Sequence, residues 1–122
     1  MPDAVFHRAF GFGPPAEVKE LKASVIQPSD EEITDLEFVT SDEKFHELLA
    51  DCYAEIPEAV AKESYFYPKD FPEQPGRQYF RRLDKRIDDN APVGCDNRPT
   101  SSMIVYDKEN GRVHISWKIL YF

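Results

Sequence analysis

The clearest hydrophobic pattern in the chain is helical and covers residues 41–56. Thr40 and Glu43 are spaced as a capping box, and acidic residues follow where the positive end of a helix dipole favours them. Apolar residues then recur at helical spacing: Phe45, Leu48, Leu49, Cys52, Tyr53 and Ile56. The pattern predicts an amphipathic helix that ends at Pro57, followed by a further turn over 58–63.

A second helical pattern covers residues 77–89. Phe80, Leu83 and Ile87 are spaced i, i+3 and i+7, which predicts an amphipathic helix with this stripe in the core. Burying each such side chain stabilises by about 1.5–3 kcal/mol, whereas an exposed ion pair contributes about 0–1 kcal/mol. We therefore expect the stripe to hold the helix, with basic residues around its rim.

The first 40 residues show weaker patterns. Apolar and polar residues alternate over 5–10, which predicts a strand that ends at the following glycines and prolines. Apolar residues at helical spacing over 16–25 predict a short helix stopped by Pro28. Residues 29–39 predict a turn followed by a short strand.

The last residues, 100–122, predict a β-hairpin, because two β-rich runs flank Asn110-Gly111. A loop of two or four residues places these apolar residues on one face: Ile104, Tyr106, Val113, Ile115, Trp117 and Ile119. A three-residue loop would reverse that pairing. Together the elements predict one α+β domain over 1–122. It has an antiparallel sheet, a C-terminal hairpin and two to three amphipathic helices on one face.

Charge changes the picture more than composition does. The 122 residues carry a net charge of −8, and residues 1–63 hold 15 acids and 5 bases, against 8 acids and 10 bases in 64–122. An acidic protein repels nucleic acid at long range, so we expect no nucleic-acid partner. Apolar runs are too short to cross a membrane, and residues 1–13 have neither a basic start nor an apolar signal core, so we expect no export by that route. These features predict a cytoplasmic protein with reduced thiols.

Five bases interrupt this acidic chain within ten residues: Arg77, Arg81, Arg82, Lys85 and Arg86. Such a cluster could hold a phosphate or the carboxylates of a partner. Alternatively, the five side chains pair with the acidic first half of the same chain while their stems cover the apolar stripe.

His114 and Asp107 form the candidate catalytic pair. With a two-residue hairpin loop they lie directly opposite one another, and a carboxylate beside an imidazole is the arrangement of a general base. An ordinary cross-strand pair is the alternative interpretation, because no nucleophile motif accompanies them. His46 is expected to be solvated, and His7 has no identifiable partner.

The cysteines and an aromatic loop complete the candidates. No metal-binding spacing is present, so we expect neither metal nor cofactor; Cys52 is expected in the core and Cys95 as an exposed thiol. The segment 64–76 combines prolines with Tyr65, Phe66, Tyr67 and Phe71. It is predicted to be an ordered loop that either covers the sheet or recognises a partner.

These observations favour a non-enzymatic protein-interaction module. The profile, small, acidic, α+β and poor in motifs, is shared by many bacterial inhibitor and immunity proteins that neutralise basic toxins. Glu43, Glu47 and Asp51 repeat at every fourth residue and would face a basic partner. One alternative is a small enzyme that clamps an anionic substrate with the basic helix and uses His114 with Asp107. Another is a homodimer that pairs edge to edge through the C-terminal strand.

Overall fold

The structure is a computed structural model, and it describes residues 1–50, 52–63, 76–82, 95, 98–99 and 102–120. Within this part, the elements in chain order are α1 (Pro2–Phe10), β1 (Lys19–Ile26), β2 (Glu31–Val39), α2 (Asp42–Leu49), β3 (Tyr53–Ile56), α3 (Glu58–Lys62), β4 (Arg77–Arg82), β5 (Met103–Asp107) and β6 (Arg112–Leu120). None of the described helices is long and apolar enough to cross a membrane.

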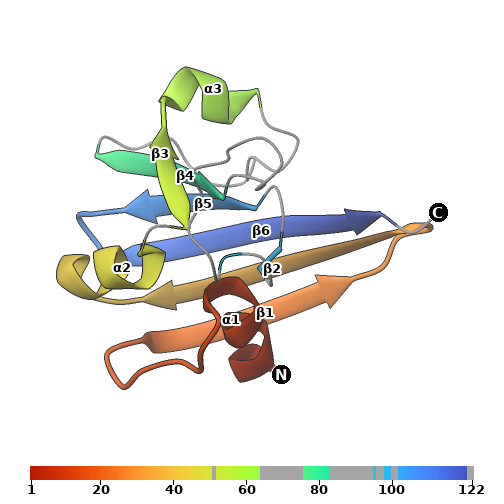
Figure 1. Cartoon of the computed structure of the whole chain (residues 1–122), viewed down its shortest axis with the longest axis horizontal. Helices are drawn as coiled ribbons and strands as arrows, with labels where there is room; N and C mark the ends of the chain where they lie inside the picture. Colours follow the sequence, from red (N-terminus) through yellow and green to blue (C-terminus); the bar gives the residue numbers. More distant parts are fainter. Residues whose placement is uncertain (51, 64–75, 83–94, 96–97, 100–101, 121–122) are drawn as a thin grey trace.

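The strands form one six-stranded sheet in the order β1-β2-β6-β5-β4-β3 (Figure 1). Every neighbouring pair is antiparallel. The predicted α+β fold class and the C-terminal hairpin are therefore confirmed. The sheet ends at β1 on one side and at β3 on the other.

The hairpin between β5 and β6 has a four-residue loop, because Asp107 is the cross-strand partner of Arg112. The predicted common face is confirmed: Ile104 lies opposite Ile115, and Tyr106 lies opposite Val113. All four side chains belong to the main hydrophobic core.

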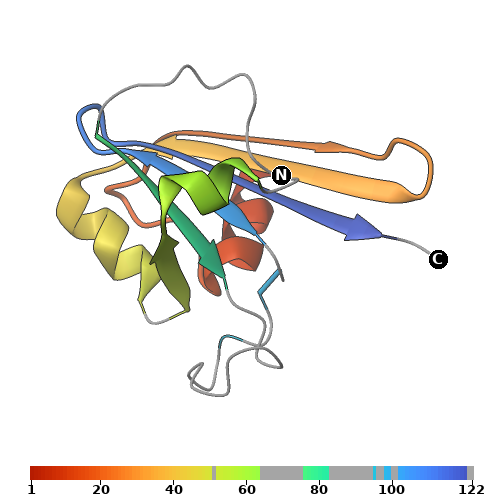
Figure 2. The ribbon, with the colours of Figure 1, turned by 90° about the horizontal axis from the view of Figure 1, so that it is seen from above.

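The two faces of the sheet are covered differently. Helices α1 and α2 lie on the same side of the sheet (Figure 2), and we call that side the core face. Its buried residues include Phe6, Phe10, Leu36, Phe38, Phe45, Leu48, Phe80, Tyr106, Ile115 and Trp117. The opposite side, the outer face, is covered by α3 only near β4 and β5, where Ala61 packs with Tyr79, Met103 and Val105.

The predicted N-terminal strand is wrong, because residues 2–10 form helix α1. Its four buried residues are Val5, Phe6, Ala9 and Phe10, which recur with the period of a helix and not of a strand. Pro2 suits the first helical turn, and Gly11 ends the helix with a φ of 86°, in the left-handed region.

The helix predicted over 16–25 is also wrong, because residues 19–26 form strand β1. Leu21 and Ala23 contact the core and alternate with exposed Lys22 and Ser24. The β-branched Val25 and Ile26 favour a strand as well. Strand β2 follows a turn, as predicted for 29–39.

The single helix predicted over 41–56 is in fact a helix followed by a strand. Helix α2 stops at Leu49, the backbone reverses at Ala50 with a φ of 46°, and residues 53–56 form strand β3. The N-cap is Ser41, which accepts a hydrogen bond from the Lys44 amide, whereas Thr40 donates to the Glu17 carbonyl. The turn predicted over 58–63 is confirmed as α3.

The predicted basic helix is wrong over 77–82, where the chain forms strand β4 between β3 and β5. Adjacent Tyr79 and Phe80 are both buried, one in each hydrophobic cluster, because the two faces are both covered at this point. An interior strand of this kind lacks polar alternation, so the i, i+3 spacing from Phe80 was misleading. Leu83 and Ile87 lie outside the described residues.

Candidate functional site

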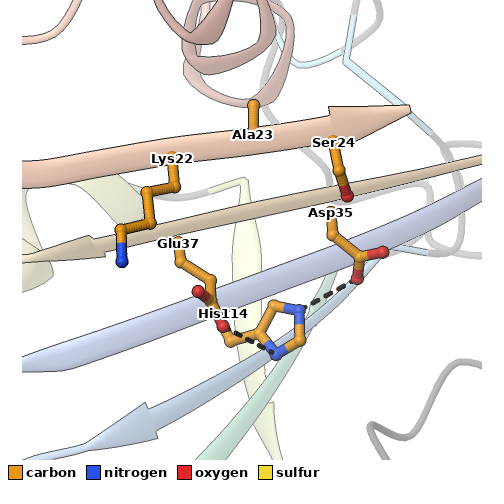
Figure 3. A pocket seen from close by; sticks show the side chains of 6 residues that line it. All are labelled: Lys22, Ala23, Ser24, Asp35, Glu37 and His114. Carbon is orange, nitrogen blue, oxygen red and sulfur yellow. Dashed lines mark hydrogen bonds and ion pairs between the residues drawn. The ribbon is translucent and has the colours of Figure 1, made fainter.

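A groove lies on the outer face of the sheet, at the end that α3 does not cover. It has a volume of about 330 Å³ and is lined by Lys22, Ala23 and Ser24 of β1, Asp35 and Glu37 of β2, and His114 of β6 (Figure 3). The strand register produces this arrangement: Lys22, Glu37 and His114 form one row across three strands. Ser24, Asp35 and Ser116 form the next row.

Asp35 is the centre of a hydrogen-bond cluster in this groove. Its Oδ1 accepts a hydrogen bond from Ser116 Oγ at 2.6 Å and lies 2.9 Å from His114 Nε2. The other ring nitrogen, His114 Nδ1, lies 3.9 Å from Glu37 Oε1. The imidazole is therefore held between two carboxylates from the neighbouring strand.

The hydrogen bond from His114 lowers the pKa of Asp35 below its ordinary value. Partial burial of the carboxyl opposes this effect, and the hydrogen bond from Ser116 adds to it. Asp35 is consequently a carboxylate at neutral pH. An ionised carboxylate can only accept, so the hydrogen between Asp35 and His114 is carried on Nε2.

This cluster contains the three side-chain types of a catalytic triad but not its connections. Ser116 Oγ lies 3.4 Å from His114 Nε2, the same nitrogen that carries the hydrogen toward Asp35. That nitrogen cannot accept the serine proton, and the hydroxyl already donates to Asp35. Ser116 is also buried. The geometry makes Ser116 and His114 donors that hold Asp35.

The predicted pair of His114 and Asp107 is wrong, because the four-residue loop places Val105, and not Asp107, opposite His114. Asp107 instead organises its own turn, accepting from the Glu109 amide at 3.1 Å and from Asn110 Nδ2 at 2.8 Å. The actual partner, Asp35, is separated from His114 by 79 positions. Local spacing gave no indication of it.

The basic residues do not form the predicted clamp. Arg82 is only 2% exposed, and its guanidinium donates to the carbonyls of Cys95 and Pro99. Arg77 and Arg81 alternate with Arg82 along β4 and so point to the outer face, opposite Asp107 and Met103 on β5. Lys85 and Arg86 lie outside the described residues. No arginine of the described chain lines the groove.

The two cysteines form a disulfide, with Cα atoms 5.5 Å apart, which corrects the prediction of free thiols. Cys95 is buried, not exposed. Arg98 donates to Cys52 Sγ and, at 2.6 Å, to the carbonyl of Phe10. The bond and this arginine together join the end of α1, the start of β3 and the segment that precedes β5.

The structure describes two of the three acidic residues that were predicted to face a partner. Glu43 and Glu47 are exposed on α2, and Asp51 lies outside the described residues. Glu47 pairs with Lys44 at 2.6 Å, and Lys44 also pairs with Glu17 at 3.0 Å, just before β1. The hydrogen bond with Lys44 is the largest cause that lowers the pKa of Glu17 below its ordinary value. The acidic surface of α2 thus adjoins the start of β1.

The remaining predictions have mixed outcomes. His46 is exposed, as expected, and contacts the Asp42 carbonyl at 2.8 Å. Among the described residues, strand β6 pairs with both β2 and β5 over 112–116 and with β2 alone over 117–120. The homodimer through the C-terminal strand stays a prediction. Tyr65, Tyr67 and the rest of the aromatic loop before Gly76 lie outside the described residues.

Within the described residues, no group of histidine, cysteine and acidic side chains is arranged to hold a metal ion. Comparisons with models of protein families, with curated proteins and with solved structures give no significant match. Function is therefore inferred from geometry and charge.

Proposed function

We propose that this protein is a non-catalytic interaction module that binds a basic protein partner through its acidic N-terminal half. Inhibitor and immunity-like proteins act in this way. The partner would be attracted by charge at long range and selected by contacts at short range.

The distribution of exposed charge carries this proposal. Of the fourteen acids in residues 1–63 that the structure describes, ten are exposed: Asp3, Glu17, Glu20, Asp30, Asp42, Glu43, Glu47, Glu55, Glu58 and Glu63. Only four bases of the same segment are exposed: Arg8, Lys19, Lys22 and Lys62. Two of these four already pair with carboxylates of the same segment: Arg8 pairs with Glu32, and Lys62 pairs with Glu58. The surplus of exposed carboxylates is thus not neutralised within this half of the chain.

The enzyme alternative receives less support from the described geometry. It needs an arginine clamp beside an acid–base pair, yet Arg82 is buried and His114 is surrounded by carboxylates. A groove with this charge would repel an anionic substrate.

Affinity capture from the native host tests the proposal. At about 0.1 M salt the wild-type chain should recover a basic protein, and near 1 M recovery should fail because the Debye length falls from about 10 Å to about 3 Å. Glu43→Gln with Glu47→Gln should weaken recovery at low salt.

The matched control is Glu55→Gln with Glu58→Gln. It removes the same charge from exposed positions on β3, the edge strand opposite β1, and on α3, which follows β3 in the chain, so it should weaken recovery less than the α2 substitutions do. Capture of a partner that is insensitive to salt and to the α2 substitutions would refute a charge-driven module.

The disulfide between Cys52 and Cys95 bears on where the protein acts. The sequence alone predicted the cytoplasm, but a disulfide persists where the surroundings are oxidising. We propose that the protein acts in, or is exported to, such a compartment. Alkylation of the protein as it is isolated from its host, followed by mass measurement, would show whether Cys52 and Cys95 are bonded.

A further inference from the structure

Strand β1 is a free edge of the sheet. It pairs with β2 alone, so alternate backbone N–H and C=O groups between Lys22 and Ile26 point away from the sheet. Six of its eight residues are exposed. Within the described residues no other strand pairs with this edge, and α1 lies on the core face.

The two halves of β1 differ in how the edge is protected. The first half has an irregular register between Lys19 and Lys22, with Glu20 at a φ of 53°, and it carries charges. Both features usually prevent another strand from pairing with an edge. The second half, 23–26, has no charge, proline or irregularity, and Val25 and Ile26 are 39% and 55% exposed.

The groove on the outer face opens directly beside this unprotected half. A strand added to β1 would lie about 4.8 Å away, so its side chains on the outer face would stand beside Lys22 and Ser24. Asp35 and Glu37 are one strand further in. Only a long side chain on the added strand can reach them.

The groove favours a positive charge on that side chain. The Asp35 and Glu37 side chains each remain 37% exposed. Asp35 Oδ1 accepts from both Ser116 and His114, while Oδ2 has no hydrogen bond within the described chain. A guanidinium can bond this second oxygen, and Lys22, at the other end of the groove, disfavours a cation there.

We propose that the 22–26 edge of β1 binds an extended segment of the basic partner by strand addition. An arginine or lysine of that segment enters the groove at Asp35. This inference rests on the proposed function and specifies its surface: backbone hydrogen bonds supply affinity, and the groove supplies selectivity.

A pair of synthetic peptides tests the inference on the full chain. Both have about nine residues, within the usual length of a strand, and alternate threonine with valine. One has arginine at the central threonine position and the other has glutamate. Titration should show the arginine peptide binding about tenfold more tightly, which corresponds to roughly 1.4 kcal/mol.

Two readouts separate strand addition from general charge attraction. Hydrogen exchange with the arginine peptide bound should slow at amides within 22–26 and stay unchanged in β3. Asp35→Asn should reduce the preference for arginine by at least about threefold, whereas Glu55→Gln, which removes the same charge at the other edge of the sheet, should preserve it.

Absence of protection at 22–26, or equal binding of the two peptides, would overturn the inference. Protection that appears without peptide as the chain is concentrated would also overturn it, because a second copy would then occupy the edge. Each of these three results leaves the proposed function intact if capture of a basic partner remains salt-sensitive. Loss of capture with intact peptide binding would refute only the charge-driven surface of α2.

Discussion

Gly111 shows how one residue fixes a contact between distant parts of the chain. Its φ is 67°, its carbonyl accepts from the Thr40 amide at 2.9 Å, and an added Cβ would lie 2.4 Å from the Thr40 carbonyl oxygen. The Asn-Gly sequence predicted the turn, but the close approach of Thr40 depends on the pairing of β2 with β6.

We predict that Gly111→Ala destabilises the fold by about 2–4 kcal/mol, because left-handed strain and a backbone clash add together. Gly76→Ala is the control: Gly76 also has a positive φ, 86°, but no described atom lies within 4 Å of the added Cβ. It should cost about 1–2 kcal/mol. Urea unfolding measures both values, and equal values would contradict the clash.

Asp35 makes stability depend on pH. Its folded pKa is lowered by His114 and then by Ser116, so its contribution is complete above the unfolded value near 3.9 and is lost as the pH falls through the folded pKa. The carboxyl is partly exposed, so the contribution at neutral pH is about 1 kcal/mol or less.

Asp35→Asn should therefore be less stable than wild type at neutral pH, and the difference should shrink below about pH 4. Urea midpoints across this range provide the measurement. His114, Glu37 and Lys22 are the other charged or titratable groups that face Asp35, and the variant leaves them unchanged. A difference that stays constant with pH would show that Asp35 acts only through packing.

At the scale of elements, the sequence predicted those with a distinct local signal. Strand β2 alternates clearly, the hairpin has an Asn-Gly turn between two β-rich runs, and the start of α2 has an N-cap and a helical stripe. The hydrophobic pattern predicted the wrong element where the strand period and the helix period fit the same residues. Phe6 and Phe10 suit either a strand or a helix, and only Val5 and Ala9 distinguish them.

Strand β4 illustrates a different failure. Its residues Tyr79 and Phe80 are buried on opposite faces, because α3 covers the outer face at that end of the sheet. Covering by a distant element is a tertiary effect that no local window contains. The same holds for the candidate site, since β1, β2 and β6 supply its residues from far apart in sequence.

The disulfide links elements rather than residues within one. It joins Cys52, just before β3, to Cys95 across a separation of 43 residues. Closing a loop of this length in the unfolded chain is worth about 4 kcal/mol in the chain-entropy model.

We expect Cys52→Ser with Cys95→Ser, or reduction of the wild type, to lower the free energy of unfolding by about 2–4 kcal/mol. Chemical unfolding with and without reductant measures the loss. The double variant should show no further change when reductant is added. An unaltered free energy of unfolding in reduced wild type would contradict a stabilising bond.

At the scale of the molecule, the acidic half of the chain supplies a free edge, a groove and the exposed helix α2. The contact of Glu17 with Lys44 brings the start of β1 beside α2. The edge 22–26 lies toward the other end of β1, and the groove lies on the face of the sheet opposite α2. A basic partner would therefore meet the carboxylates of α2 only with a part of its surface that extends beyond the segment paired with β1.

Hydrogen exchange of the wild-type chain, alone and with the captured partner, tests this account most directly. It predicts slower exchange at β1 amides within 22–26 and no change at β3, the other edge of the sheet. Protection at β3 with none at 22–26 would contradict it, because the partner would then bind away from the acidic edge and its groove.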